Sequence, residues 1–226
     1  MSERPIQQGE SDPYPGRMTS MPTRARGGRE ARFEERRTQL ALSALDTLAE
    51  LGYAQTSLRD IAQHSEFTHG VVHYYFADKG ELISHCVRVF HDRLVSRFDD
   101  DLASYHDLDE MGAAVAAKLV FTLTEETAQH RLWYDLRAQS MFNEVIREDV
   151  RQIDASLEGF AWRIVLRYAE LSGTTPVVDS ATNYRMYDGI FQNALLDHLA
   201  GVPDAAERVV EQTSWLMQQI CPCGHR

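Results

Sequence analysis

Residues 57–75 read SLRDIAQHSEFTHGVVHYY. Two short helices are expected in this stretch, because each half opens on a residue that commonly caps a helix, Ser57 and Thr68. Asp60 follows Ser57 by three residues, as in a short capping box. The connection runs from Ser65 to Thr68. This outline predicts a helix-turn-helix, whose second helix enters the major groove of DNA, although a helical hairpin inside a bundle has the same outline.

The second of these helices carries more aromatic and polar side chains than a buried hairpin needs. Only Val72 and Phe76 are clearly required in a core. Tyrosine and histidine can donate hydrogen bonds to phosphate oxygens, valine can contact a thymine methyl, and glycine lets the backbone approach the duplex closely. The positions that suit a DNA groove are Thr68, His69, Gly70, Val71, His73, Tyr74 and Tyr75.

Two basic residues stand where a helix usually disfavours them. Arg59 lies in the first turn of one expected helix, and Lys79 lies at the first position of the next. A cation there faces the positive end of the helix dipole. An external anion would remove this conflict, because a DNA phosphate at a helix N-terminus binds both the free N–H groups and the added cation. The alternative is that both are solvated surface charges.

The remaining chain is helical by the spacing of its apolar residues, without a convincing alternating strand pattern. A helix that opens at Asp78 continues to an acidic stop at residues 99–101. Apolar residues recur at three- and four-residue steps between Glu144 and Ser172. Helices are expected at 30–51, 109–129, 131–142, 144–172, 180–200 and 204–220. The fold class is therefore all-α.

The formal net charge of −11 argues at first against a nucleic-acid partner, because phosphate binding relies on Lys and Arg. The charge is unevenly distributed, however. Residues 1–95 carry 12 Lys and Arg against 13 Asp and Glu, and residues 96–226 carry a net charge of −10. The acidic excess thus lies outside the helix-turn-helix region. Discrimination between DNA sequences should then come mostly from base contacts and paired half-sites.

Three cysteines, Cys86, Cys221 and Cys223, cannot build a disulfide framework, and their odd number suits a reducing cytoplasm. The first thirty residues lack the apolar centre of a signal peptide. No stretch reaches the roughly 18 uncharged apolar residues that span a bilayer. A cytoplasmic protein without a membrane partner is expected.

Three runs of sequence resemble the DNA-binding domain of the TetR family of bacterial transcriptional regulators: TSLRDIA at 56–62, GVVHYYF at 70–76 and KGEL at 79–82. The match extends from Phe33 to Leu82. The resemblance implies a homodimer, an all-helical effector-binding C-terminal domain, and release from a palindromic operator when a small molecule binds. It also implies phosphate contacts from Ser57, His73, Tyr75 and Lys79 and base contacts from Arg59, His69, Val71 and Tyr74.

Two positions depart from the family pattern. Family members commonly have Gly at the position of Glu66, where a left-handed backbone would cost another residue about 1 kcal/mol. Glu66 would also bring a negative charge near the duplex. The position usually held by Tyr is His73, so one phosphate contact would depend on pH near neutrality.

A sensor domain needs an apolar pocket with a few oriented polar groups. Core packing is the alternative for most of the effector-site candidates, which are Phe121, Trp133, Asp135, Arg137, Phe142, Trp162 and Tyr187. Apolar faces on the last two long helices predict a four-helix bundle across a two-fold axis, with packing inside one subunit as the alternative. The dimer candidates are Tyr184, Ile190, Phe191, Leu195, Leu199, Val209, Leu216 and Met217.

The C-terminal run of Cys221, Cys223 and His225 has the residue types of a zinc site but supplies only three ligands within five residues, so no metal is expected. No local nucleophile signature and no Gly-rich phosphate loop indicate an enzyme, and no cofactor is expected.

The sequence thus predicts a ligand-responsive repressor that binds double-stranded operator DNA, a small-molecule effector and a second copy of itself. Its expected parts are a flexible arm at 1–28, a helix-turn-helix DNA-binding domain at 29–78, an effector-binding and dimerisation domain at 79–220, and a tail at 221–226. The competing interpretation is a helical effector-binding or metal-binding protein that does not bind DNA.

Overall fold

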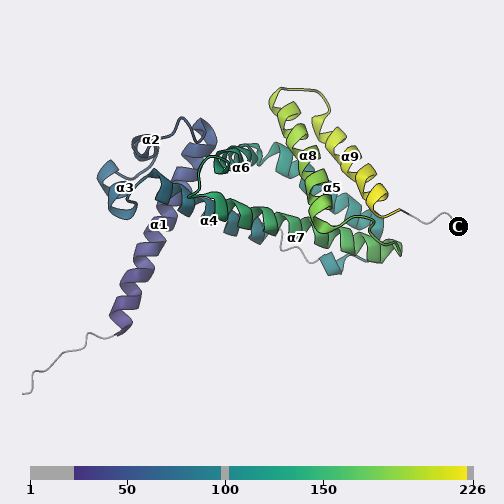
Figure 1. Ribbon diagram of the computed structural model, residues 1–226, viewed down its shortest axis with the longest axis horizontal. Helices are drawn as coiled ribbons and strands as arrows, with labels where there is room; N and C mark the ends of the chain where they lie inside the picture. Colours follow the sequence, from purple (N-terminus) through teal and green to yellow (C-terminus); the bar gives the residue numbers. More distant parts are fainter. Residues whose placement is uncertain (1–22, 98–101, 223–226) are drawn as a thin grey trace, which may run out of the picture. The chain divides into compact units, whose positions relative to one another are not determined.

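The computed structural model describes residues 23–97 and 102–222, with side chains described over 28–91 and 102–222. The chain divides into two units, residues 1–35 and residues 36–226. Every regular element within the described residues is a helix, which confirms the all-α prediction (Figure 1). None of these helices combines the length and the apolar character of a membrane span.

The first four helices are α1 (Thr23–Leu51), α2 (Leu58–Gln63), α3 (His69–Tyr75) and α4 (Lys79–Arg97). The starts of α2, α3 and α4 agree with the sequence signals. Helix α1 begins at Thr23 and not at Glu30, so the expected flexible arm is wrong for residues 23–28; Arg24, Ala25 and Arg26 favour helix, although Gly27 and Gly28 do not. Residues 1–22 of that arm and the acidic stop at 99–101 lie outside the described residues.

The second half of the chain holds five longer helices after a short 3-10 helix, η1 (Leu102–Ser104). The five are α5 (Leu108–Thr124), α6 (Thr127–Ser140), α7 (Arg147–Ser172), α8 (Ser180–Leu199) and α9 (Ala205–Ile220). Helix α5 ends earlier than expected, and α6 begins at Thr127 and not at Arg131. The hydroxyl of Thr127 donates to the Leu123 carbonyl at 2.6 Å, which satisfies one of the free carbonyls at the end of α5.

The largest hydrophobic core contains side chains of the first four helices together with side chains of α6 and α7. Phe90 of α4 and Trp133 of α6 stack within it, with ring centroids 6.3 Å apart. Two smaller clusters lie among α5 and α7 to α9. Helices α8 and α9 run side by side in Figure 1 and contact each other extensively. The helices around residues 57–75 therefore share one core with part of the larger helical region.

Candidate functional site

The start of α2 is closed by a complete capping box. The backbone N–H of Asp60 donates to the Ser57 hydroxyl at 3.2 Å, and the Ser57 N–H donates to the Asp60 carboxylate at 2.8 Å. The Ser57 hydroxyl also donates to this carboxylate at 2.5 Å, and these bonds hold the pKa of Asp60 below its usual range. The negative charge of Asp60 thus stays fixed at the N-terminus of α2, where the helix dipole favours it.

The connection to α3 is held by local hydrogen bonds without backbone strain. The hydroxyl of Ser65 accepts the Phe67 N–H at 3.2 Å, and Thr68 caps α3 by accepting the Val71 N–H at 3.3 Å. Glu66 does not have a positive φ, since Asp204 alone does among the described non-glycine residues. The expected left-handed conformation at Glu66, with its cost, is therefore wrong: a turn without that conformation has no need of glycine.

Helix α3 is anchored on one side and open on the other. Val72 is fully buried, and Phe76 directly after the helix is 1% exposed. The opposite side presents His69, whose ring lies edge-on to that of His73 with centroids 4.5 Å apart, and Tyr74, whose side chain is 72% exposed. Of the ten expected DNA contacts, seven are exposed: Ser57, Arg59, Thr68, His69, Gly70, His73 and Tyr74; Val71, Tyr75 and Lys79 are half-buried.

Lys79 makes a structural contact that the sequence did not reveal. Its Nζ donates to the Tyr53 carbonyl at 2.7 Å and lies 4.2 Å from the centre of the Tyr53 ring. Partial burial lowers the pKa of Lys79, and the nearby carboxylates of Asp135 and Asp60 oppose this shift. The ammonium group therefore helps to hold the segment between α1 and α2.

A cavity of about 640 Å³ lies among α5, α6, α7, α8 and α9, with further lining from η1 and the residues after it. Most of its wall is apolar or aromatic. The aromatic side chains that line it are Tyr105, Trp133, Tyr134, Phe160, Tyr168, Tyr184, Tyr187 and Phe191. Pockets for drug-sized ligands typically measure roughly 300–1,000 Å³ and have mainly apolar walls with a few polar groups. The cavity therefore has the size and lining of a small-molecule site.

Asp188 in the wall of this cavity belongs to a network in which two carboxylates surround one guanidinium, that of Arg137. Arg137 lies 2.5 Å from Asp188 and 3.5 Å from Asp154. The Tyr134 hydroxyl donates to Asp188 at 3.1 Å, and the Tyr184 hydroxyl donates to Asp154 at 2.8 Å. Burial raises the pKa of both phenols, which therefore remain protonated donors.

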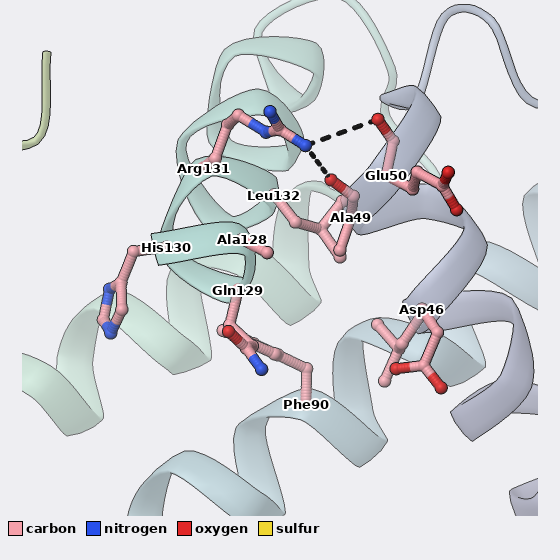
Figure 2. Close-up of a pocket in the computed structure, with 10 residues that line it drawn as sticks. Asp46, Ala49, Glu50, Phe90, Ala128, Gln129, His130, Arg131 and Leu132 are labelled. Carbon is pink, nitrogen blue, oxygen red and sulfur yellow. Dashed lines mark hydrogen bonds between the residues drawn. The ribbon is translucent and has the colours of Figure 1, made fainter. Parts of the chain in front are cut away.

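Helix α6 contacts both the cavity and the end of α1 that leads into α2. Its N-terminal turn borders a smaller pocket of about 350 Å³ beside α1 (Figure 2). There Arg131 points toward the end of α1 and donates to the carbonyls of Ala49 and, at 3.3 Å, Glu50. His130 points to the other side of the helix and lines both cavities. One turn later, Asp135 accepts the Tyr53 N–H at 2.6 Å.

Residues 42–86 match the model of the bacterial regulatory proteins of the tetR family. The matched segment contains the capped α2, the turn, and α3 with its buried and exposed sides. This segment of the chain matches the TetR family of transcriptional regulators. Regulators of this family are generally not enzymes. A comparison with curated proteins gives no significant match.

Solved structures share the fold over most of the chain. A TetR regulator from Haloarcula marismortui has 19% identity and a TM-score of 0.61, covering 83% of this chain and 99% of its own. A regulator from Saccharomonospora viridis in complex with choline has 15% identity and a TM-score of 0.69, covering 84% and 100%. FadR from Bacillus subtilis, in complex with stearoyl-CoA, has 15% identity and a TM-score of 0.60, covering 83% and 98%.

Two of the seven effector-site candidates, Trp133 and Tyr187, line the large cavity. Arg137 does not line the cavity itself but forms an ion pair with Asp188, which does. The other four are misplaced: Phe121 and Phe142 are 53% and 88% exposed, Trp162 packs among α7 to α9, and Asp135 binds the Tyr53 N–H. Phe142 misses the cavity because α6 already ends at Ser140.

The expected dimer surface is partly wrong as well. Tyr184, Leu195, Val209 and Leu216 are buried within the single chain, so they stabilise one subunit and present no surface to a second. Tyr184 and Phe191 line the cavity. Ile190, Phe191 and Met217 are half-buried, whereas Leu199 is exposed.

Another residue important to the cavity, Asp188, was missed by the sequence interpretation. Asp188 follows Tyr184 by four residues and precedes Phe191 by three, so these side chains share one helix face. An acid between aromatic residues at this spacing could have indicated the site. Of the three possible zinc ligands at the C-terminus, Cys221 is buried, whereas Cys223 and His225 lie outside the described residues. The described part of the chain holds no group of side chains that could bind a metal ion.

Proposed function

We propose that this regulator is a homodimeric repressor, which binds a palindromic operator through α3 and leaves it when a small molecule occupies the large cavity. The observation that supports this proposal is that α3 is buried on one side and exposed on the other. Its buried side fixes Val72 and Phe76 in the core, so the exposed side with His69, His73 and Tyr74 is available to a major groove.

The expected contacts divide into two classes. Arg59, His69, Val71 and Tyr74 would read bases, and Ser57, Thr68, His73, Tyr75 and Lys79 would bind the backbone, with Gly70 allowing close approach. Base contacts specify a site, whereas phosphate contacts mainly position the protein. The Tyr53 carbonyl takes one of the three Nζ hydrogens of Lys79, so its contribution to DNA affinity should be smaller than that of Arg59.

Helix α6 supplies the coupling. His130, Trp133 and Tyr134 face the cavity, while Arg131 and Asp135 bind the end of α1 and the Tyr53 N–H. A ligand that shifts α6 would therefore also shift the segment that leads into α2. Release from DNA then follows if the ligand binds better to a conformation in which the two copies of α3 are wrongly spaced.

Dimerisation would use the exposed apolar side chains of α8 and α9. Leu199 is one of the expected residues, and it is joined by Met186, Leu196 and Trp215, whose exposed fractions are 43%, 59% and 60%. Exposed apolar side chains that form one contiguous patch are typical of protein interfaces. Leu196→Asp should give a folded monomer with weak operator affinity, and an unchanged dimer in sedimentation experiments would contradict this surface.

Fluorescence anisotropy with the promoter DNA beside the protein's own gene tests the DNA-binding proposal. The full chain should bind with a salt-sensitive, sequence-selective affinity. Tyr74→Ala should alter sequence preference, as should Arg59→Ala, whereas Arg151→Ala should bind like the wild type, because the exposed Arg151 lies on α7. Binding without sequence selectivity, or equal effects of the two arginine variants, would overturn the proposal.

The two ligand-bound relatives define the range of possible effectors. Choline is a small cation and stearoyl-CoA is a large anion with an acyl chain, so cavities of this fold accept both signs of charge. The side chains of this chain's own cavity must decide between them.

A further inference from the structure

We propose that the effector is an organic cation with an apolar body, a quaternary ammonium compound, whose charged group lies among the aromatic rings beside Asp188. This inference rests on the proposed function, because it assigns a ligand class to the cavity. The charges and the aromatic side chains around that cavity support the inference.

The cavity has one negative charge in excess. Among the described residues, its charged lining side chains are Asp109, Lys118 and Asp188, and His130 is the further titratable base. Behind Asp188, the guanidinium of Arg137 is shared with Asp154. The single guanidinium of Arg137 thus pairs with two carboxylates, so one negative charge beside the cavity stays uncompensated. A positively charged ligand would balance it.

Burial of Asp154 agrees with this imbalance. Desolvation raises the pKa of Asp154 even though Arg137 and the Tyr184 hydroxyl both favour its ionised form. The buried carboxylate is therefore only partly compensated by its partners. An added positive charge in the cavity would stabilise the ionised carboxylates, whereas an anionic head group would meet repulsion.

The hydrogen bonds of the network indicate what kind of cation fits. Both oxygens of Asp188 and both oxygens of Asp154 already accept a hydrogen bond or ion-pair contact from Tyr134, Tyr184 or Arg137. A cation without N–H donors loses nothing at such a site. The faces of aromatic rings attract such cations, and eight aromatic side chains line the cavity.

The size of the cavity indicates an apolar body in addition to the charged head. A volume of about 640 Å³ lies in the range of pockets for drug-sized ligands, and much of the wall beyond Asp188 is formed by aliphatic residues of α5 and α7. A compact ion would leave that part unfilled. An alkyl or aryl group attached to the ammonium would cover it.

Isothermal titration calorimetry on the full chain tests this assignment with three probes below their micellar concentrations: benzyldimethyldecylammonium, decyl sulfate and choline. The benzyl cation should bind at least about tenfold tighter than either of the others. Equal or tighter binding of decyl sulfate would overturn the charge assignment. If choline binds as tightly as the benzyl cation, the inference that the effector has an apolar body is wrong.

Asp188→Asn should weaken binding of the benzyl cation by at least about tenfold, because the substitution keeps the side-chain shape and removes the charge. Asp197→Asn is the matched control, since Asp197 lies on the same helix but pairs with Arg208 outside the cavity. A folded Asp188→Asn protein with wild-type affinity would contradict the proposal. If that variant does not fold, the three wild-type titrations decide.

The titrations contain no DNA, so they fail or succeed independently of the repressor proposal. A cation that binds as expected but leaves DNA affinity unchanged would contradict the proposed function and support the ligand class.

Discussion

Replacement of the two adjacent valines of α3 tests the orientation of this helix most sharply. Val72 has no exposed surface, whereas Val71 is half-buried on the side expected to face DNA. Val72→Ala removes two buried methyl groups at about 0.8 kcal/mol each, and the resulting cavity raises the loss to about 2–3 kcal/mol. For a chain of this size, the melting temperature should fall by about 4–12 °C.

Val71→Ala is the matched control, because both substitutions change helix propensity equally. It should lower the free energy of unfolding by less than about 1 kcal/mol and change the preference for operator sequence. Urea denaturation followed by circular dichroism measures the first effect, and anisotropy with operator variants measures the second. If Val71→Ala destabilises the protein as much as Val72→Ala, α3 is rotated and the DNA-facing side is wrongly assigned.

Two further predictions concern contacts of α6 and α7. Asp135→Ala should destabilise the protein by about 1–3 kcal/mol in urea denaturation, because the Tyr53 N–H loses its acceptor; a change below the error of the measurement would refute this role. Burial raises the pKa of Asp154, so the folded state holds its proton more tightly than the unfolded chain does. Its contribution to stability is therefore present at acidic pH and is lost as pH rises through the raised pKa. The stability of the wild type relative to Asp154→Asn should accordingly be greater in mild acid than at neutral pH; a difference independent of pH would contradict the shift.

The helix-turn-helix could be predicted closely because its signals are local. Ser57 with Asp60, and Thr68 with Val71, decide within one helical turn where α2 and α3 begin. The buried and exposed sides of α3 follow from the positions of its apolar residues. The contact between Lys79 and Tyr53 could not be predicted, because these residues are far apart in sequence and only the folded chain brings them together.

The cavity and the dimer surface could be predicted only in outline. An apolar stripe on a helix looks the same whether it packs inside one subunit or against another, so Tyr184 and Val209 could not be separated from Leu199. Small errors in helix ends also matter. An α6 extended to Phe142 places that ring on a helix face, whereas the observed end at Ser140 leaves it exposed in the connection.

The most direct test of the account is the operator affinity of the full chain with and without saturating benzyldimethyldecylammonium, measured by anisotropy on the DNA beside its own gene. Occupation of the cavity should weaken operator binding by at least about fivefold, as expected for allosteric coupling. Unchanged operator affinity, at a cation concentration that calorimetry shows to fill the cavity, would contradict the coupling of cavity to α3 through α6.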